Sequence, residues 1–187
     1  MASPLPRPAT RMKLEELSQR KFFAMPNPKG YSARQIRLHW MVAVVIVLQF
    51  VLHEPMSQAW EGIEEGDSPA FNWLVLAHIA GGALVLIFAL WRLGLRQMRG
   101  VPPVPDAGSA PLRVAAHLVH WGLYTLMIAM PLSGGVAWFG GISAAAEAHE
   151  AMKPALLALV AVHVLAALWH QFWLKDGLML RMKRPLD

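Results

Sequence analysis

The chain has 187 residues, of which 56% are hydrophobic, and it contains eight tryptophans and no cysteine. Its mean hydropathy of +0.39 is too high for an ordinary soluble domain, and the lack of cysteine excludes disulfides and thiolate metal ligands. The formal net charge is +5, but no base-reading motif accompanies the basic residues, so we expect no nucleic-acid partner. These features predict an all-α integral membrane protein that contacts membrane lipid.

Residues 1–30 contain five prolines and are expected to form a cytoplasmic N-terminal extension. This segment is either a flexible basic tail or carries a short amphipathic helix at 14–23 along the inner membrane surface. The following residues, 31–35, have the pattern of a capping box, with Ser32 as N-cap and Gln35 returning a hydrogen bond. The first long helix should therefore begin near Ala33.

Four uncharged runs are long enough, or nearly so, to cross a membrane as helices. They predict helices at about residues 33–53, 70–93, 112–138 and 146–174, which together form a four-helix transmembrane bundle over residues 31–184. An acidic loop should join the first two helices at 54–72. In the third run, Pro131 and the glycines that follow predict a kink and then an irregular segment.

The distribution of charge predicts the orientation of the bundle. Sixteen of the seventeen Lys and Arg residues lie in the N-terminal tail, the 92–113 connection or the C-terminal tail, and only Lys153 falls on the opposite side. By the positive-inside rule both termini are cytoplasmic. The outer surface then carries seven acids, which would attract a cationic partner and repel an anion. They are Glu54, Glu61, Glu64, Glu65, Asp67, Glu147 and Glu150.

Four histidines fall at membrane depth, where imidazoles are costly and mark functional sites. His149 and His163 are fourteen residues apart on one helix, which corresponds to about four turns and roughly 21 Å. With alternating helix directions, His39 lies at the depth of His163 and His78 at the depth of His149. Each pair can supply both axial ligands of a haem b, which leaves outer-sphere electron transfer as the chemistry. Two haems are therefore expected, with irons roughly 20 Å apart.

Other residues compete for these roles or complement them. Two glycines, Gly81 and Gly82, could leave room for a macrocycle or allow close helix packing. His117 and His120 are rival ligands to His39, and together with Arg113 they are candidates for contacts with a haem propionate or a quinone headgroup. A purely structural role is equally open for one of these two histidines. His170 is a weaker ligand candidate at the interface, and His53 is either solvated or part of an outer proton path.

The sequence resembles the bacterial cytochrome b561 family, small four-helix di-haem proteins related to the b-type subunits of hydrogenases and formate dehydrogenases. The resemblance covers about residues 31–184. It is carried by Leu38-His39-Trp40, Ala77-His78-Ile79, Ala116-His117, Met130-Pro131-Leu132, Ala148-His149-Glu150 and Val162-His163. It implies one haem on His39 and His163, a second on His78 and His149, and electron exchange with ubiquinone in the bacterial inner membrane. Residues 1–30 match no part of the family that we can align.

We therefore expect transmembrane electron transfer between the quinone pool and a periplasmic redox partner, such as a cationic electron-transfer protein, or a small molecule. Some members of the family are superoxide oxidases, quinone-linked oxidoreductases that pass electrons from periplasmic superoxide to ubiquinone. The acidic outer surface argues against an anionic substrate, so this activity is kept as one specific version. The alternative is a membrane-anchor cytochrome b subunit that passes electrons from a separate dehydrogenase to quinone. A histidine-based metal transporter would need carboxylates at membrane depth, and the uncharged runs lack them.

Overall fold

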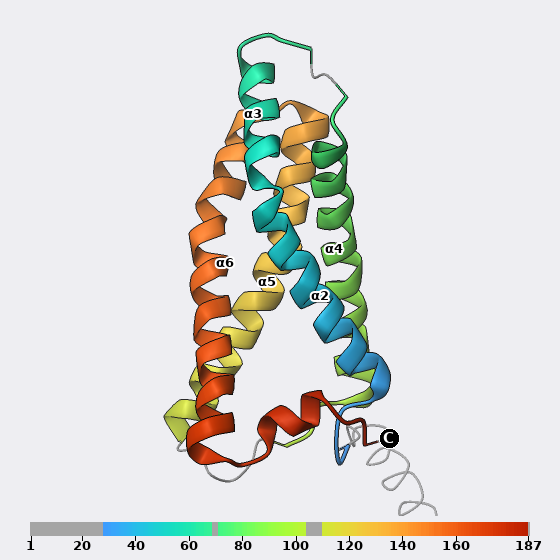
Figure 1. The fold of residues 1–187 in the computed structure, drawn as a ribbon, viewed down its shortest axis with the longest axis vertical. Coiled ribbons are helices and arrows are strands. Elements are labelled where there is room, and N and C mark those ends of the chain that lie inside the picture. The colour runs from blue at the N-terminus through green and yellow to red at the C-terminus, as the bar shows by residue number, and fades with distance from the viewer. Residues whose placement is uncertain (1–27, 69–70, 104–109, 187) are drawn as a thin grey trace, which may run out of the picture.

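The computed structural model describes residues 28–68, 71–103 and 110–186, and the expectations for residues 1–27 lie outside this part. The described residues form α2 (Ala33–Val51), α3 (His53–Glu64), α4 (Trp73–Arg99), α5 (Ala110–Gly140) and α6 (Ser143–Trp169), followed by η1 (His170–Leu174) and η2 (Leu178–Met182). Four segments are long and apolar enough to cross a membrane, namely α2, α4, α5 and α6 together with η1. The predicted all-α bundle with four candidate spans is confirmed (Figure 1).

The capping box forms as the sequence predicts. The hydroxyl of Ser32 accepts a hydrogen bond from the Gln35 amide at 3.3 Å, and the Gln35 side chain accepts one from the Ser32 amide at 2.9 Å. The Gln35 side-chain nitrogen also donates to the carbonyl of Gly100 at 3.3 Å. The start of α2 is therefore fixed to the end of α4, and both ends are held at the same level of the bundle.

The acidic connection was expected to be a loop, and this expectation is wrong because the structure forms α3 there. The chain bends at Leu52, and Pro55 lies in the first turn of α3, where a missing amide hydrogen is tolerated. A hydrogen bond of 2.9 Å from Gln58 to Glu54 links successive turns. After Glu65, Gly66 adopts a φ of 94°, which ends the helix.

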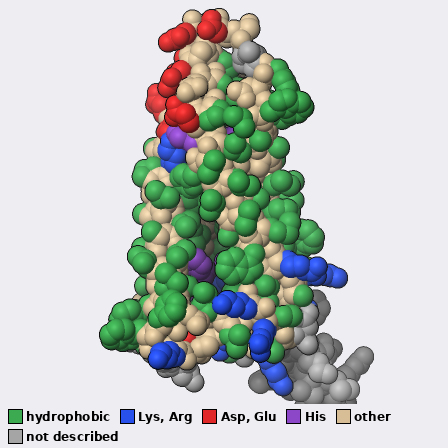
Figure 2. Space-filling view, viewed as in Figure 1, with side chains coloured by type: hydrophobic (Ala, Val, Ile, Leu, Met, Phe, Trp, Pro, Cys, Tyr) green, Lys and Arg blue, Asp and Glu red, His purple; other side chains and the backbone are tan. Residues whose placement is uncertain are grey.

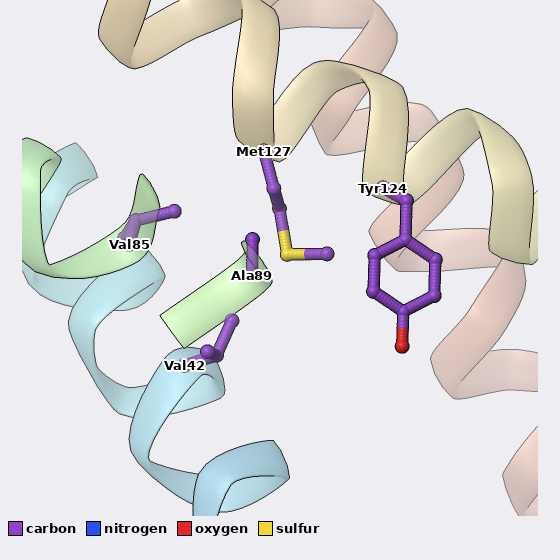
Figure 3. Packing of buried hydrophobic residues seen from close by; sticks show 5 residues of the cluster. All are labelled: Val42, Val85, Ala89, Tyr124 and Met127. Atoms are coloured by element: carbon purple, nitrogen blue, oxygen red, sulfur yellow. The ribbon is translucent and has the colours of Figure 1, made fainter. Parts of the chain in front are cut away.

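Neighbouring helices pack in the order α2, α4, α5, α6, and α3 covers the end of α4 (Figure 1). The buried core joins α2, α4 and α5 through Val42, Val85, Ala89, Tyr124 and Met127 (Figure 3). Among the described residues, α6 is in broad contact with α5 but not with α2 or α4. Space for bound groups therefore remains between α6 and those two helices.

Helices α5 and α6 both contain an internal proline and continue past it. The irregular segment expected after Pro131 is confined to Gly141, with a φ of 63°, and Ile142, because α5 runs on to Gly140. Similarly, α6 is continuous through Pro154. The histidines of α6 consequently lie on one uninterrupted rod.

Residues 175–186, here called the C-terminal strap, cross one end of the bundle (Figure 1). Trp40 of α2 donates its indole N–H to the carbonyl of Met182 at 2.9 Å, and the Leu186 amide donates to the carbonyl of Tyr31 at 3.2 Å. These bonds attach the strap to the beginning of α2.

Charged side chains separate to the two ends of the molecule, with Asp and Glu at one end and most Lys and Arg toward the other (Figure 2). We call the end formed by α3 and the α5–α6 turn the acidic end. The end formed by the start of α2, the end of α4 and the C-terminal strap is the basic end.

Candidate functional site

The structure brings the four membrane-depth histidines together as two pairs, which are the pairs that helix depth predicts. The ring centroids of His39 on α2 and His163 on α6 are 6.1 Å apart. Those of His78 on α4 and His149 on α6 are 6.4 Å apart, and both pairs have an interplanar angle of 64°. The first pair lies toward the basic end and the second toward the acidic end, so that α6 contributes one imidazole to each.

The spacing within each pair suits a metal placed between two imidazoles. A metal–imidazole bond is about 2 Å long and the ring centroid lies roughly 1.1 Å beyond the nitrogen, so two imidazoles on opposite sides of one metal have centroids about 6 Å apart. Both pairs have this separation. By contrast, His120 and His163 are 5.3 Å apart, which is a direct edge-on ring contact. The geometry thus favours His39 over its rival His120 as the partner of His163.

The His149 ring is oriented by α5. Its Nδ1 atom donates to the carbonyl of Met130 at 2.8 Å and lies 3.4 Å from the hydroxyl of Ser133. A Cβ atom added at Gly134 would be 3.0 Å from the same nitrogen, so glycine allows the ring to approach the helix this closely. Sequence analysis did not identify the role of Met130 or Gly134, although the glycines after Pro131 were a signal that something approaches this backbone.

The other two ligand candidates each have a buried nitrogen without a partner. Nδ1 of His39 and Nδ1 of His78 make no hydrogen bond within the described protein. A buried polar atom left unpaired is costly, and such atoms are uncommon in folded proteins. Their presence in both pairs fits imidazoles whose partner is a bound group rather than the polypeptide.

A cavity of about 590 Å³ opens beside His78 and His149. This volume is typical of cofactor sites, which range over about 300–1,000 Å³. Gly82 of α4 and Gly135 of α5 line it, and a Cβ atom at Gly135 would meet no atom within 4 Å. Gly81 has a different role, because it packs closely against the Gln49 side chain of α2. Of the two interpretations of these neighbouring glycines, each therefore applies to one residue.

A polar group of three residues lines the cavity near the acidic end. The Lys153 ammonium donates to Nε2 of His53 at 2.5 Å and to the Glu150 carboxylate at 2.6 Å. With Nε2 accepting, Nδ1 of His53 carries the proton, 3.8 Å from Glu150. His53 is therefore half-buried in a network between α3 and α6 and does not interact mainly with its neighbour Glu54.

Two arginines of α4 lie near the basic-end pair, and sequence analysis assigned them only to membrane topology. The guanidinium of Arg92 is 5.8 Å from the Tyr124 ring centroid and hydrogen-bonds the Tyr124 hydroxyl. The guanidinium of Arg96, one turn later, is 5.7 Å from the Trp121 ring centroid. Arg92 also lies within electrostatic range of His39 and His163. Their position inside the bundle could not be inferred from charge counting.

The remaining candidates lie around this pair or apart from it. His120 is exposed, and its Nδ1 donates to the carbonyl of Ala116 at 2.6 Å. His117 is exposed one turn before it, and Arg113 lies in the first turn of α5. His170 is bonded through Nδ1 to the carboxylate of Asp176 at 2.5 Å, and it pairs with no other histidine in the described chain.

Comparisons with known proteins agree with this arrangement. A family model described as prokaryotic cytochrome b561 matches residues 7–185. Because this match begins at residue 7, the expectation that residues 1–30 lack a counterpart in the family is wrong for most of that segment.

Several curated proteins are similar over nearly their full length. Cytochrome b562 of Cereibacter sphaeroides is 36% identical over 161 residues, which covers 86% of this chain and 99% of that protein. The probable superoxide oxidase CybB of Yersinia pestis is 29% identical over 178 residues, covering 82% of this chain and 96% of its own. Cytochrome b561 homolog 1 of Escherichia coli is 26% identical over 175 residues, with coverage of 81% and 96%.

Proposed function

Because the chain belongs to the prokaryotic cytochrome b561 family, we propose that its two histidine pairs bind two haems b and carry electrons across the membrane between ubiquinone and a periplasmic redox partner. Membership of the family makes the chain a b-type cytochrome that transfers electrons. With four helices able to span a bilayer, it is a multi-pass protein of the bacterial inner membrane.

The observation that carries the proposal is the separation of 6.1 Å and 6.4 Å within the two histidine pairs. Haem b, when bound, supplies a reversible one-electron couple, and two imidazoles per iron leave no position for oxygen or substrate. The polypeptide orients the ligands: the Met130 carbonyl holds the proton on Nδ1 of His149 and leaves Nε2 with its lone pair. The continuous helix α6 fixes the distance between the two pairs.

The orientation follows from the positive-inside rule, with the basic end in the cytoplasm and the acidic end in the periplasm. Glu61, Glu64 and Glu65 are exposed at the acidic end. Their charge supports a cationic electron-transfer protein as the periplasmic partner. The similarity to a probable superoxide oxidase supports superoxide as the competing substrate, and Lys153 is the nearest cation for an anion that reaches the cavity.

The basic end is the proposed site of quinone exchange. His120 lies in contact with His163, and His117 and Arg113 precede it on α5. Because Nδ1 of His120 donates to a carbonyl, its Nε2 is an acceptor that suits the hydroxyl of a quinol. Replacing both His120 and Arg113 by alanine should slow haem reduction by a ubiquinol analogue, and an unchanged rate would move the quinone site elsewhere.

The direct test is the haem content of the purified chain. A pyridine haemochrome assay should give two haems b per polypeptide, and reduced-minus-oxidised spectra should show both as six-coordinate and low-spin. One haem or none in intact, folded protein would contradict the proposal. A dehydrogenase subunit that remains bound throughout purification would indicate the alternative function of a membrane anchor.

A further inference from the structure

Arg92 and Arg96 form a cationic pair that faces the interior of the basic end. Residues four apart on a helix lie on the same side, with Cβ atoms about 5–6 Å apart. Arg92 is half-buried against Tyr124, and the guanidinium of Arg96 rests near the ring of Trp121. Both arginines lie within electrostatic range of His120, and Arg92 is also near His39 and His163. The aromatic rings thus hold two positive charges beside the basic-end histidine pair.

In the part of the chain that the structure describes, neither arginine pairs with a carboxylate. The recorded ion pairs involve His53, Lys153 and His170. Asp176 is the acid of the basic end that the structure describes, and it already accepts hydrogen bonds from His170 and the Leu178 amide. Arginine within a membrane-spanning helix is costly unless an anion or water compensates its charge. The bundle therefore presents two guanidinium groups that lack an anionic partner.

We propose that Arg92 and Arg96 bind the two propionate carboxylates of the haem held by His39 and His163. This inference rests on the proposed function. Haem b carries both carboxylates along one edge, so a ligand bound between His39 and His163 brings two anions to one side of its ring. Guanidinium groups bind carboxylates through two parallel hydrogen bonds, and two arginines one turn apart match two carboxylates.

Two tyrosines add neutral donors to this cluster. Tyr31 lies within electrostatic range of Arg96, Arg92 and Tyr124. Burial raises the pKa of Tyr31, while Arg96 opposes this shift, and the net result is a hydroxyl that stays protonated at neutral pH. A protonated hydroxyl can donate to a carboxylate. The cluster therefore contains hydrogen-bond donors with no acid among them, as a carboxylate site requires.

The cluster should also set the reduction potential of this haem. Reduction adds one negative charge at the iron, and nearby positive charge in a medium of low dielectric favours that state. The acidic end has the opposite composition, because Glu150 and Glu147 line the cavity beside His78 and His149. The haem at the basic end is thus expected to have the higher midpoint potential.

The test compares charge-removing and charge-retaining variants of the full chain in an optical redox titration. Arg92→Gln, Arg96→Gln and the double variant should lower the midpoint potential of the basic-end haem and leave that of the acidic-end haem unchanged. Arg92→Lys should restore most of the shift. Arg99→Gln removes the same charge from an exposed position in the last turn of α4, so it is a matched control that should change neither potential. A basic-end haem that is present in the double variant with an unaltered potential would overturn the proposal.

A second measurement separates propionate contact from a nearby charge. The full chain, emptied of haem, is reloaded with haem b or with its dimethyl ester, which lacks the carboxylates. Wild type should hold haem b at the basic-end pair about tenfold or more tighter than the ester, and the double variant should lose this preference. Equal binding of acid and ester, with a potential that follows the phosphatidylglycerol content of nanodiscs, would show that the arginines bind lipid phosphate instead. Absence of any haem at His39 and His163 in wild type would refute the proposed function itself.

Discussion

The Nδ1 atom of His149 donates a hydrogen bond to the carbonyl oxygen of Met130, which lies 2.8 Å away on the neighbouring helix. A carbonyl can only accept, so this contact fixes the tautomer of the imidazole and leaves Nε2 free to bind a metal. Ser133 donates to the same carbonyl at 2.9 Å. The orientation of one proposed haem ligand therefore depends on the backbone of α5 next to Pro131.

This relationship predicts the effect of enlarging Gly134. In Gly134→Ala, the new Cβ atom would lie 3.0 Å from Nδ1 of His149, so the ring must move or lose its bond to Met130. Overpacking of this kind costs about 1–3 kcal/mol of folding stability. The low-spin signal of the acidic-end haem, measured by electron paramagnetic resonance, should shift or broaden.

Gly94→Ala is the matched control, because no atom lies within 4 Å of a Cβ atom there. It should leave both haem signals unchanged and, as a Gly→Ala change within a helix, stabilise the protein by about 0.5–1 kcal/mol. If Gly134→Ala also left the acidic-end signal unchanged, the proposed contact would not control the ligand.

The histidine pairs predict selective loss of haem. His39→Ala or His163→Ala should remove one low-spin haem signal, and His78→Ala or His149→Ala the other, because each iron loses one of two ligands. His117→Ala and His170→Ala are controls that should retain both haems, since these rings belong to neither pair. A basic-end haem lost in His120→Ala but kept in His39→Ala would contradict the pairing.

The acidic end predicts how the periplasmic partner is selected. Changing Glu61, Glu64 and Glu65 to Gln should slow electron exchange with a basic cytochrome c by about tenfold at low salt. The difference should shrink at physiological ionic strength, where the Debye length is about 8 Å. The same variant should react with superoxide as fast as wild type or faster. A rapid superoxide reaction in wild type, coupled to quinone reduction, would instead make superoxide oxidation the function.

The C-terminal strap should be sensitive to acid. Burial alone would raise the pKa of Asp176, but hydrogen bonds from His170 and the Leu178 amide hold it below its ordinary value of 3.8. A carboxyl with a lowered pKa in the folded state stabilises that state above its unfolded pKa, and this contribution disappears as the pH falls below it.

In hydrogen exchange at pH 7, Asp176→Asn should therefore reduce protection of the strap amides. Glu147→Gln, a change at an exposed acid of α6, should not. Wild type and Asp176→Asn should become alike below about pH 3. Equal protection of the two proteins at pH 7 would show that this carboxylate does not hold the strap.

The features that sequence alone predicted are those set by local pattern or helical geometry. The capping box at Ser32 depends on four consecutive residues, and the histidine pairs follow from the rise of α6. In contrast, α3 was missed because its polar residues give no hydropathy signal, whereas its internal bond from Gln58 to Glu54 appears only in the folded chain.

Tertiary contacts account for the rest of what sequence did not reveal. Arg92 and Arg96 satisfied the positive-inside rule as members of a basic connection, and this explanation hid their position inside the bundle. The bond from His149 to Met130 joins residues nineteen positions apart on two helices. No periodicity in either helix specifies which carbonyl the ring will meet.

The placement of both His149 and His163 on α6 has a consequence for the energised cell. Their separation of about 21 Å is roughly two thirds of the hydrocarbon thickness of about 30 Å. An electron moving between the two pairs would cross a similar share of the transmembrane voltage, which is worth about 2.3 kcal/mol per charge per 100 mV. The resulting bias of about 1.5 kcal/mol per 100 mV is close to a tenfold change in how electrons divide between the two positions. With a negative cell interior, this voltage pushes electrons toward the acidic end, so the chain would respond to membrane polarisation as well as to the quinone pool.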